Sequence, residues 1–401
     1  MGTPEDIGRA VQRLYNTYPF PPDPLTDGPP PGYNWRWHWP AVHSFCTGAL
    51  PVRRDIHILD AGCGTGVGTD YLAHLNPEAT ITALDLSEQA LAVAQERTRR
   101  SGVPRPVTFH HLSLLEVASL GLTFDYINCV GVLHHLPDPA AGLRALADCL
   151  APGGLLHIFV YAAYGRWEIR LLQEAIRLLN PSANPVQGVQ TGRQLLAHLP
   201  RDNRLVQREK QRWAMENHWD ASFADMYVHP QEVDYTVDSL FDLMSSTDLA
   251  FLGFSNPDHW QLERLLGTDP DLLAAAQGLP LRQRYRLVDV LDPETTHYEF
   301  FLGRPPVPQF TWDEDADFLA AIPEVYPCLT GWPSPSLLDR DYRPLDLDAP
   351  SFQLLSACDG RRTVADVLHQ TGADLSLVRQ LWQRYLLVLT PAGTSGRPAS
   401  V

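Results

Sequence analysis

Three glycines at alternate positions form the part of the sequence whose residue types and spacing are best suited to chemistry. Residues 56–66 read Ile-His-Ile-Leu-Asp-Ala-Gly-Cys-Gly-Thr-Gly, an apolar run that ends in Asp60 and continues into Gly62, Gly64 and Gly66. This order predicts a strand, a tight turn and the start of a helix. Glycines allow positive φ and a close approach of a ligand to the backbone, and the free N–H groups of a helix start favour negative charge. The stretch therefore predicts a site for a nucleotide-type ligand.

The glycine spacing narrows the kind of nucleotide. A dinucleotide fingerprint has the spacing G-x-G-x-x-G, whereas Val67 stands at its third position here and G-x-G-x-G fits instead. A pyrophosphate ligand is therefore disfavoured. A second apolar run ends at Asp85, about 20 residues further on, where an acidic residue at a strand end would bind both ribose hydroxyls. A glycine turn in an unrelated α/β protein is the alternative interpretation.

A third motif follows the predicted strand at residues 124–129. That strand leads into Val-Gly-Val-Leu-His-His-Leu-Pro-Asp-Pro at residues 130–139. Taken in this order, the three motifs resemble those of class I S-adenosylmethionine-dependent methyltransferases. The third is similar to a segment of the small-molecule enzymes of that family, such as the ubiquinone and menaquinone C-methyltransferases. The resemblance implies a Rossmann-like fold and S-adenosylmethionine as the methyl donor.

The donor is expected beside several strand ends, because ligands of open α/β sheets bind beyond the carboxyl ends of the strands. In related enzymes an Asp near the exit of the third strand commonly holds the adenine amino group, but Ser113 takes that place here. Either Ser113 or the backbone beside it would then bind adenine. The predicted donor-binding residues are Asp60, Ala61, Gly62, Cys63, Gly64, Thr65, Gly66, Asp85, Leu86, Ser113, Leu114, Cys129, Val130 and Gly131.

Three histidines are the candidates for catalysis. Methyl transfer from a sulfonium depends mainly on alignment of the reactants, and a base is needed only when the acceptor must lose a proton. His134 and His135 are the nearest titratable residues, and His229 closes a second polar segment at residues 225–229. Histidine acts as a base near neutral pH. The alternative is structural: packing at the strand exit for the pair, and a surface loop for His229.

The composition and net charge of the chain limit the classes of substrate that it is expected to bind. The 401 residues are 44% hydrophobic and 19% charged, as expected for a globular protein with one large domain and an appendage. The formal net charge of −16 argues against nucleic acid, which is usually bound by clustered Lys and Arg. A small-molecule, lipid-like or protein acceptor is favoured.

The chain is expected in the cytoplasm. No apolar stretch approaches the roughly 18 residues that span a bilayer, and residues 1–10 lack the basic and apolar parts of a signal peptide. The six cysteines are scattered without C-x-x-C pairs. This pattern predicts neither a disulfide framework nor a metal site, and it fits a reducing compartment.

Residues 1–45 are predicted to form an N-terminal helix and a Pro- and aromatic-rich arm. Prolines are dense from residue 19 to residue 31 and forbid regular structure there. Aromatic side chains then alternate with polar ones over residues 33–39, which would lay four aromatics on one face of an extended segment. This strip either packs on the core or covers the methyl donor as a lid.

Residues 46–305 are predicted to form the methyltransferase domain, an α/β fold with a seven-stranded, mostly parallel sheet and helices on both faces. A helical insertion at about 166–230, with helices at 166–180 and 190–216, would cap the cleft and set substrate choice. Residues 259–291 are expected to form a second helical insertion.

The C-terminal part is predicted to be separate. Residues 306–340 carry six prolines and are expected to be a linker. Residues 341–391 predict three short helices and a strand, similar to a small winged-helix module, and the tail 392–401 is expected to be disordered. Acidic residues slightly outnumber basic ones between 341 and 390, which favours docking or dimerisation over DNA binding.

Three hypotheses follow from the sequence. The first is a methyltransferase that acts on a small or lipid-like acceptor at oxygen, carbon or nitrogen. The second is a protein methyltransferase that docks its substrate through the C-terminal module. The third is a non-catalytic scaffold that binds S-adenosylmethionine, which the joint presence of Asp60, the three glycines and Asp85 disfavours.

Overall fold

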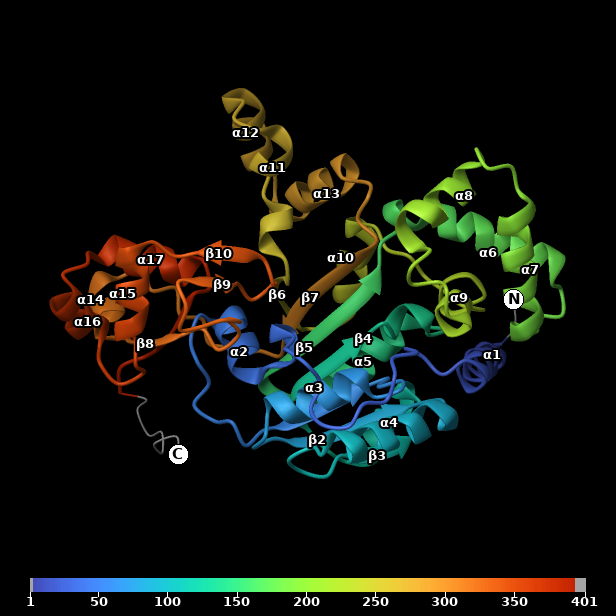
Figure 1. Ribbon diagram of the computed structural model, residues 1–401, viewed down its shortest axis with the longest axis horizontal. Coiled ribbons are helices and arrows are strands. Elements are labelled where there is room, and N and C mark those ends of the chain that lie inside the picture. Colours follow the sequence, from blue (N-terminus) through green and yellow to red (C-terminus); the bar gives the residue numbers. More distant parts are fainter. Residues whose placement is uncertain (1–2, 394–401) are drawn as a thin grey trace. The chain divides into compact units, whose positions relative to one another are not determined.

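A seven-stranded sheet organises the protein, which a computed structural model describes over residues 3–393 (Figure 1). The strand order is β3-β2-β1-β4-β5-β7-β6. Strand β4 pairs in parallel with β1 and β5, and β2 with β3, whereas β7 is antiparallel to both its neighbours. The predicted seven-stranded, mostly parallel sheet is confirmed. The strands are β1 His57–Ala61, β2 Thr80–Asp85, β3 Thr108–His111, β4 Phe124–Val130, β5 Leu150–Tyr161, β6 Ala250–Phe254 and β7 His297–Gly303.

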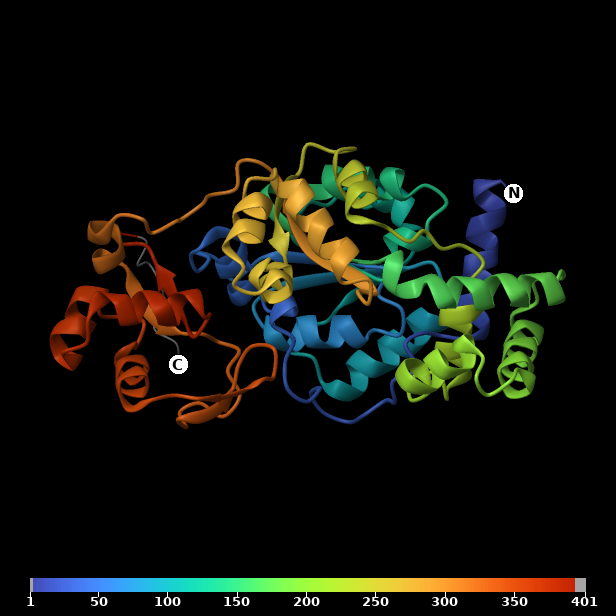
Figure 2. The same cartoon turned by 90° about the horizontal axis from the view of Figure 1, so that it is seen from above.

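Helices cover both faces of the sheet (Figure 2). On one face α5 (Pro139–Cys149), α10 (Val237–Met244) and α13 (Leu281–Leu291) pack their apolar side chains onto the strands in the main core cluster. On the other face α4 (Glu88–Ser101) packs Leu91 against Ala83 of β2. Central strands that are buried on both faces need continuous apolar residues, which explains why most of β5 is apolar and buried.

A helical cap lies between β5 and β6 in the chain. Its helices pack together around a small core that also contains Leu14 of α1 (Pro4–Thr17). The predicted helix at 190–216 is wrong in its bounds, because Asn184 caps a helix that begins at Pro185 and the chain leaves it before Pro200. The cap helices are α6 Trp167–Leu179, α7 Pro185–His198, α8 Arg204–Arg208 and α9 Asp220–Tyr227. The expected second insertion contains α11 (Glu263–Leu266), α12 (Pro270–Gln277) and α13.

Contacts divide the chain into two units. The sheet and the cap belong to the first, and the second contains Pro29–Ile56, Tyr71–Thr80 and the chain from Pro306 onward. Its elements are η1 Trp35–Trp37, α2 Trp39–Thr47, α14 Asp315–Ala320, β8 Ile322–Val325, β9 Ser336–Leu338, β10 Pro344–Asp346, α15 Ala349–Ala357, α16 Val364–Thr371, α17 Leu375–Gln383 and β11 Leu387–Thr390. The three expected helices and the strand are present. Strand β8, inside the expected linker, pairs with β11, and the winged-helix comparison stays a prediction.

The aromatic strip at residues 33–39 is not extended. Trp35 lies in the 3₁₀ turn η1 and is fully buried. Within the second unit, the Arg340 guanidinium lies 4.4 Å from the Trp35 ring centroid, and Tyr33 stacks on Tyr342 at 4.7 Å. These contacts agree with the packing alternative. The predicted disordered tail falls largely on residues 394–401, outside the described residues, and within 3–393 no helix has the length and apolar character that a membrane span requires.

Candidate functional site

The ends of β1 and β2 meet at the carboxyl edge of the sheet. The N–H groups of Gly62 and Cys63, just after β1, donate to the Leu84 carbonyl in β2 at 2.8 and 2.9 Å. Gly64 N–H donates to Asp85 Oδ2 at 2.8 Å. The structure therefore brings the glycine loop and the second acidic motif together, as the sequence predicts.

The glycine loop is held by close packing. Gly64 has a φ of 51°, and a Cβ built there would lie 2.3 Å from the Phe20 carbonyl oxygen. The same carbonyl accepts from Thr65 N–H at 3.0 Å, and Gly66 N–H donates to Cys63. All N–H groups of residues 62–66 thus have protein partners. The N–H groups of the helix start follow from Val67 onward, and their role toward a ligand stays a prediction.

Asp85 keeps the capacity to bind hydroxyls. Its Oδ1 accepts from Ser87 N–H at 2.8 Å, and its Oδ2 from Gly64 N–H. Each carboxylate oxygen has two acceptor positions, so each retains one for a further donor. Burial raises the pKa of Asp85, and the two backbone N–H groups oppose that rise.

Asp60 has an internal role. Its carboxylate accepts from the Thr69 hydroxyl at 2.5 Å and from Asn128 Nδ2 at 2.8 Å. The side chain is 3% exposed, and burial raises its pKa. Asp60 therefore ties the end of β1 to α3 (Val67–Leu75) and to β4.

The other predicted donor residues lie at the same edge, mostly with their side chains inward. Ser113 caps η2 (Leu114–Leu120) by accepting from Leu115 N–H at 3.3 Å. Gly131, just after β4, has a φ of 76°, and the space beside its Cα is open. Only the backbone of the buried residues can face a ligand there; these are Ala61, Cys63, Leu114 and Cys129. Leu86 and Val130 are half-buried.

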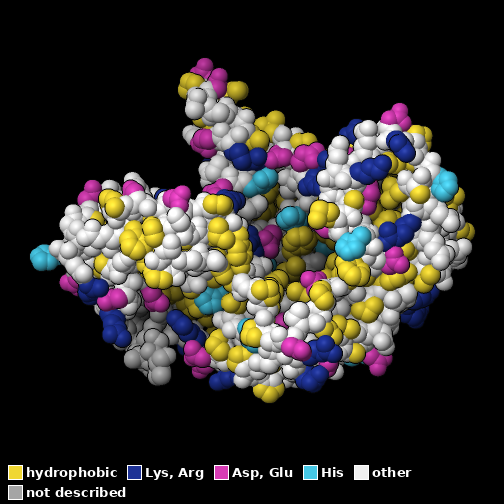
Figure 3. Space-filling model, in the orientation of Figure 1, with side chains coloured by type: hydrophobic (Ala, Val, Ile, Leu, Met, Phe, Trp, Pro, Cys, Tyr) yellow, Lys and Arg dark blue, Asp and Glu magenta, His cyan; other side chains and the backbone are white. Residues whose placement is uncertain are grey.

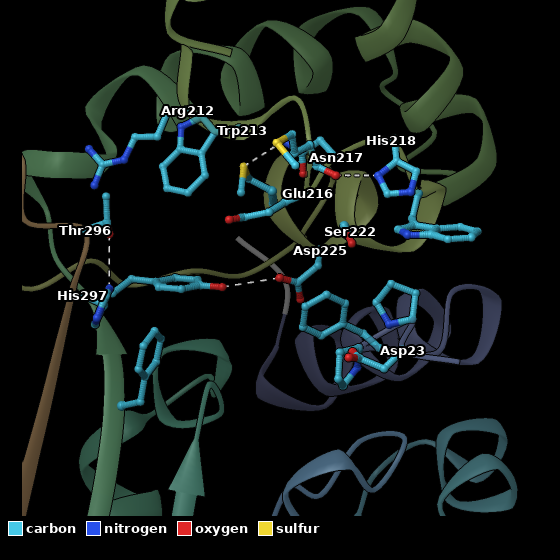
Figure 4. Close-up of a pocket in the computed structure, with 18 of the residues that line it drawn as sticks. Asp23, Arg212, Trp213, Glu216, Asn217, His218, Ser222, Asp225, Thr296 and His297 are labelled. Atoms are coloured by element: carbon cyan, nitrogen blue, oxygen red, sulfur yellow. Dashed lines mark hydrogen bonds between the residues drawn. The ribbon is translucent and has the colours of Figure 1, made fainter. Parts of the chain in front are cut away.

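A pocket of about 710 Å³ lies next to this edge, within the first unit. It is lined by residues 20–24 of the arm, the end of β5, the segment 212–226 and residues 296–297. The space-filling view is hollowed where these elements meet (Figure 3). Figure 4 shows Arg212 and Trp213 on one side, Asp23 on the other and Asp225 between them. We call this hollow the acceptor pocket, after the role proposed for it below.

Asp225 is the buried carboxylate of the acceptor pocket. It is 5% exposed and accepts from the Tyr15 hydroxyl at 2.8 Å and from the Tyr161 hydroxyl at 3.4 Å. Burial raises its pKa, and His135 and the Tyr15 hydrogen bond oppose the rise. The sequence placed Asp225 only at the start of a polar segment. Nothing in the local pattern shows that tyrosines distant in the chain meet it.

The three predicted histidines lie together and are buried. His135 stacks on His229 with ring centroids 3.6 Å apart, and His134 lies 4.0 Å from the Tyr161 ring. Burial lowers the pKa of all three. None of them is among the residues that line the acceptor pocket, and His229 lines a second pocket of about 160 Å³. Their catalytic role stays a prediction.

Comparison with known proteins identifies the family. A sequence profile described as a methyltransferase domain matches residues 59–156. This range includes the glycine loop, Asp85 and the end of β4, and we call the carboxyl edge of the sheet at these residues the donor edge. PKMT2 from Rickettsia typhi, solved in complex with AdoHcy, shares the fold with a TM-score of 0.61 at 16% identity, over 90% of this chain and 77% of that one. The chain belongs to the class I S-adenosylmethionine-dependent methyltransferases.

The relatives differ in how much of the methyltransferase they cover. An uncharacterized protein of a Synechococcus strain, syc1184_c, is 54% identical over 98% of this chain and 95% of its own length. An uncharacterized phycocyanin operon protein W of Pseudanabaena tenuis is 68% identical over 23% of this chain and 87% of its length. The ubiquinone biosynthesis O-methyltransferase of Aromatoleum aromaticum is 40% identical, but over only 24% of this chain and 40% of that enzyme.

The residues of this methyltransferase fit S-adenosylmethionine as its cofactor. Asp85 offers acceptor positions for two ribose hydroxyls, and the open space at Gly131 leaves room at the end of β4. The N–H groups of residues 62–66 bond to protein acceptors, which agrees with a donor that has no phosphate. Among the described residues, no group of His, Cys, Asp and Glu side chains is arranged to hold a metal ion.

Proposed function

We propose that this methyltransferase is catalytically active and transfers a methyl group to an acceptor bound in the acceptor pocket. One observation carries the proposal: the arm segment that begins at Phe20 both bonds to the glycine loop and lines the pocket. Donor edge and acceptor pocket thus share a wall. When bound, S-adenosylmethionine supplies an electrophilic methyl group on a sulfonium. The contribution of the protein is to align the acceptor and to exclude water.

The charges of the acceptor pocket disfavour an anionic acceptor. Asp23, Glu216 and Asp225 supply three carboxylates, and Arg212 is its only guanidinium among the described residues. Arg212 is already paired with Glu294 at 3.1 Å. An uncharged or cationic acceptor therefore fits the pocket better than a carboxylate or a phosphate.

A protein acceptor is one candidate. The likeness to phycocyanin operon protein W is high, at 68% identity over 92 residues, and genes of one operon commonly serve one process. A phycocyanin subunit is therefore the first protein acceptor to test. The exposed aromatic rim of the pocket, where Trp219 is 54% exposed, suits contact with a macromolecule.

A small-molecule or lipid-like acceptor is the second candidate. It is supported by the pocket volume, which suits a ligand of several rings, and by the likeness to ubiquinone biosynthesis O-methyltransferases. That likeness covers a quarter of the chain.

Two measurements test the proposal. Calorimetry should show that the intact protein binds S-adenosylmethionine and that D85A weakens binding at least tenfold, because the ribose loses a charged acceptor. Radiolabelled donor should then be incubated with phycocyanin subunits produced without this protein, and in parallel with a lipid and small-molecule extract. Label found in protein alone would reject the hypothesis of a small acceptor, and label found in the extract alone would reject phycocyanin as the acceptor. If the protein does not bind the donor at all, the proposal that it is an active enzyme is overturned.

A further inference from the structure

Asp225 is positioned as a reacting group. It projects from α9 into the acceptor pocket beside the end of β5 (Figure 4). Its two hydrogen-bond donors within residues 3–393 are the phenols of Tyr15 and Tyr161, one on each oxygen. Each oxygen therefore keeps an acceptor position that points to no protein donor. A buried carboxylate with unused acceptor capacity in a pocket is suited to accept a hydrogen from a ligand.

Helix α1 connects this carboxylate to the donor edge. Three of its residues lie on one face, and Tyr15 is the one that bonds to Asp225. Gln12 Nε2 donates to the Leu86 carbonyl at 2.9 Å, and Asn16 accepts from the Ser87 hydroxyl at 2.8 Å. The same helix thus fixes Asp225 and the residues that follow Asp85. Because one helix holds both sites, an acceptor atom that is bound to Asp225 would lie at a fixed distance and orientation from the donor edge.

We infer that Asp225 is the catalytic residue that takes the proton from the acceptor atom, and that this atom is a nitrogen or oxygen bearing hydrogen. The inference rests on the proposed function and names the acceptor class of the same pocket. Amides, amines and hydroxyls belong to this class. Carbon and sulfur acceptors do not, because C–H and S–H groups donate only weakly to a carboxylate.

The step is balanced without any co-reactant. The lone pair of the acceptor nitrogen or oxygen forms the new bond to the methyl carbon while the sulfur–methyl bond breaks, and that electron pair remains on sulfur. The proton of the acceptor passes to a free position on the Asp225 carboxylate and then to water. Tyr15 and Tyr161 hold the carboxylate in place and stabilise its ionised form.

The surroundings of Asp225 determine how it titrates. His135 in η3 (Leu133–His135), Arg166 in η4 (Tyr164–Arg166) and Glu232 in the following loop are its charged or titratable neighbours, besides the two tyrosines. Burial raises the pKa of Asp225, and His135, Tyr15 and Arg166 lower it. Turnover should therefore fall on the acid side, as Asp225 becomes protonated.

The experiment compares D225N with D220N in the full-length protein. In D225N the amide oxygen accepts from one tyrosine hydroxyl and the NH₂ group donates to the hydroxyl oxygen of the other, so the variant should fold. Asp220 is an exposed carboxylate at the start of the same helix, paired with Arg193. With ¹³C-methyl S-adenosylmethionine and the phycocyanin or extract fraction that wild type labels, D225N should reduce the transfer rate about 100-fold or more. D220N should match wild type, and donor affinity should stay within twofold in both.

Two further readouts separate catalysis from structure. Y15F removes a donor to the ionised carboxylate, so it should move the acid limb of the pH–rate profile to higher pH, and D225N should lack that limb. The ¹³C shift of the transferred methyl group should report attachment to nitrogen or oxygen. Wild-type rates in D225N, or a methyl group on carbon or sulfur, would overturn the inference. Failure of wild type to bind the donor would instead overturn the proposed function.

Discussion

Gly64 shows how a single backbone position joins the arm to the donor edge. Its N–H group reaches Asp85, and the Phe20 carbonyl occupies the place that a side chain would need. Gly64 therefore takes part in two contacts that have different roles. One orients the carboxylate that would bind ribose, and the other seats the wall of the acceptor pocket.

The variant G64A should therefore weaken donor binding more than its conformational strain explains. Alanine at positive φ costs about 1 to 2 kcal/mol, and its Cβ would displace Phe20 as well. Calorimetry should show at least a tenfold loss of S-adenosylmethionine affinity. Gly102 offers a matched control, because it has a φ of 69° but open space beside it. G102A should lose similar unfolding free energy in urea and keep donor affinity, and equal affinities in the two variants would contradict this account.

At the scale of elements, a chain of buried hydrogen bonds crosses five neighbouring strands. From Asp60 in β1 it passes to Asn128 in β4, and His157 Nδ1 in β5 lies 2.8 Å from the Asn128 side-chain oxygen. His157 Nε2 then lies 3.1 Å from Glu299 in β7, which accepts from Ser255, just after β6, at 2.7 Å. Because Asn128 must turn its NH₂ group to Asp60, both ring nitrogens of His157 meet acceptors. The His157–Glu299 pair therefore shares one proton.

The variant H157L should be costly, because it removes the hydrogen bonds that His157 forms with Asn128 and with Glu299. Losing each of these buried bonds costs about 1 to 3 kcal/mol, so the unfolding free energy should fall by about 2 to 6 kcal/mol in urea titrations. E299Q is the control. Its amide can donate to neutral His157 and accept from Ser255, so its loss should stay within about 1 kcal/mol. A larger loss in E299Q than in H157L would show that charge, and not hydrogen bonding, holds the chain together.

The sequence predicts the elements of the sheet well and the contacts between distant elements poorly. The strands around Asp60 and Asp85 follow from local apolar runs and glycine spacing, which act within a few residues. The packing of Trp35 in the second unit and the meeting of Tyr15 with Asp225 depend on residues some 200 to 300 positions away. Hydrophobic periodicity reports on the local element and does not show which distant residues meet. The histidines were singled out by residue type, whereas the pocket-facing carboxylate could be recognised only in three dimensions.

At the scale of the whole molecule, a buried ionic cluster joins the cap to the sheet. Arg166, just after β5, pairs with Glu232 at 3.0 Å and with Asp234 at 3.7 Å, and all three side chains are at most 5% exposed. The segment that carries the two carboxylates also bonds to the sheet, since Tyr235 N–H donates to the Tyr161 carbonyl at 2.9 Å. Unfolding of the protein would separate the cap from the sheet and expose this cluster to water. The protonation of its carboxylates therefore affects the free energy of unfolding.

Burial raises the pKa of Asp234 to about 8, and the second cause of this rise is the negative charge of Glu232. In the unfolded chain the same carboxyl titrates near its ordinary value of 3.8, so between these two values the folded state holds a proton that the unfolded state has lost. Stability should then fall as pH rises from about 4 through about 8, by at most about 1.4 kcal/mol per pH unit for one proton. D234N cannot ionise and should lack this contribution.

Urea unfolding from pH 5 to pH 9 measures the difference directly. The stability of D234N relative to wild type should increase steadily up to about pH 8 and then level off, because wild-type Asp234 is by then ionised. D242N is a suitable control, since Asp242 is 69% exposed and its pair with Arg282 lies at the surface, where such pairs contribute little. Its curve should run parallel to wild type. If the D234N curve is parallel as well, Asp234 is ionised in the folded protein at every pH tested, and Arg166 outweighs both burial and Glu232.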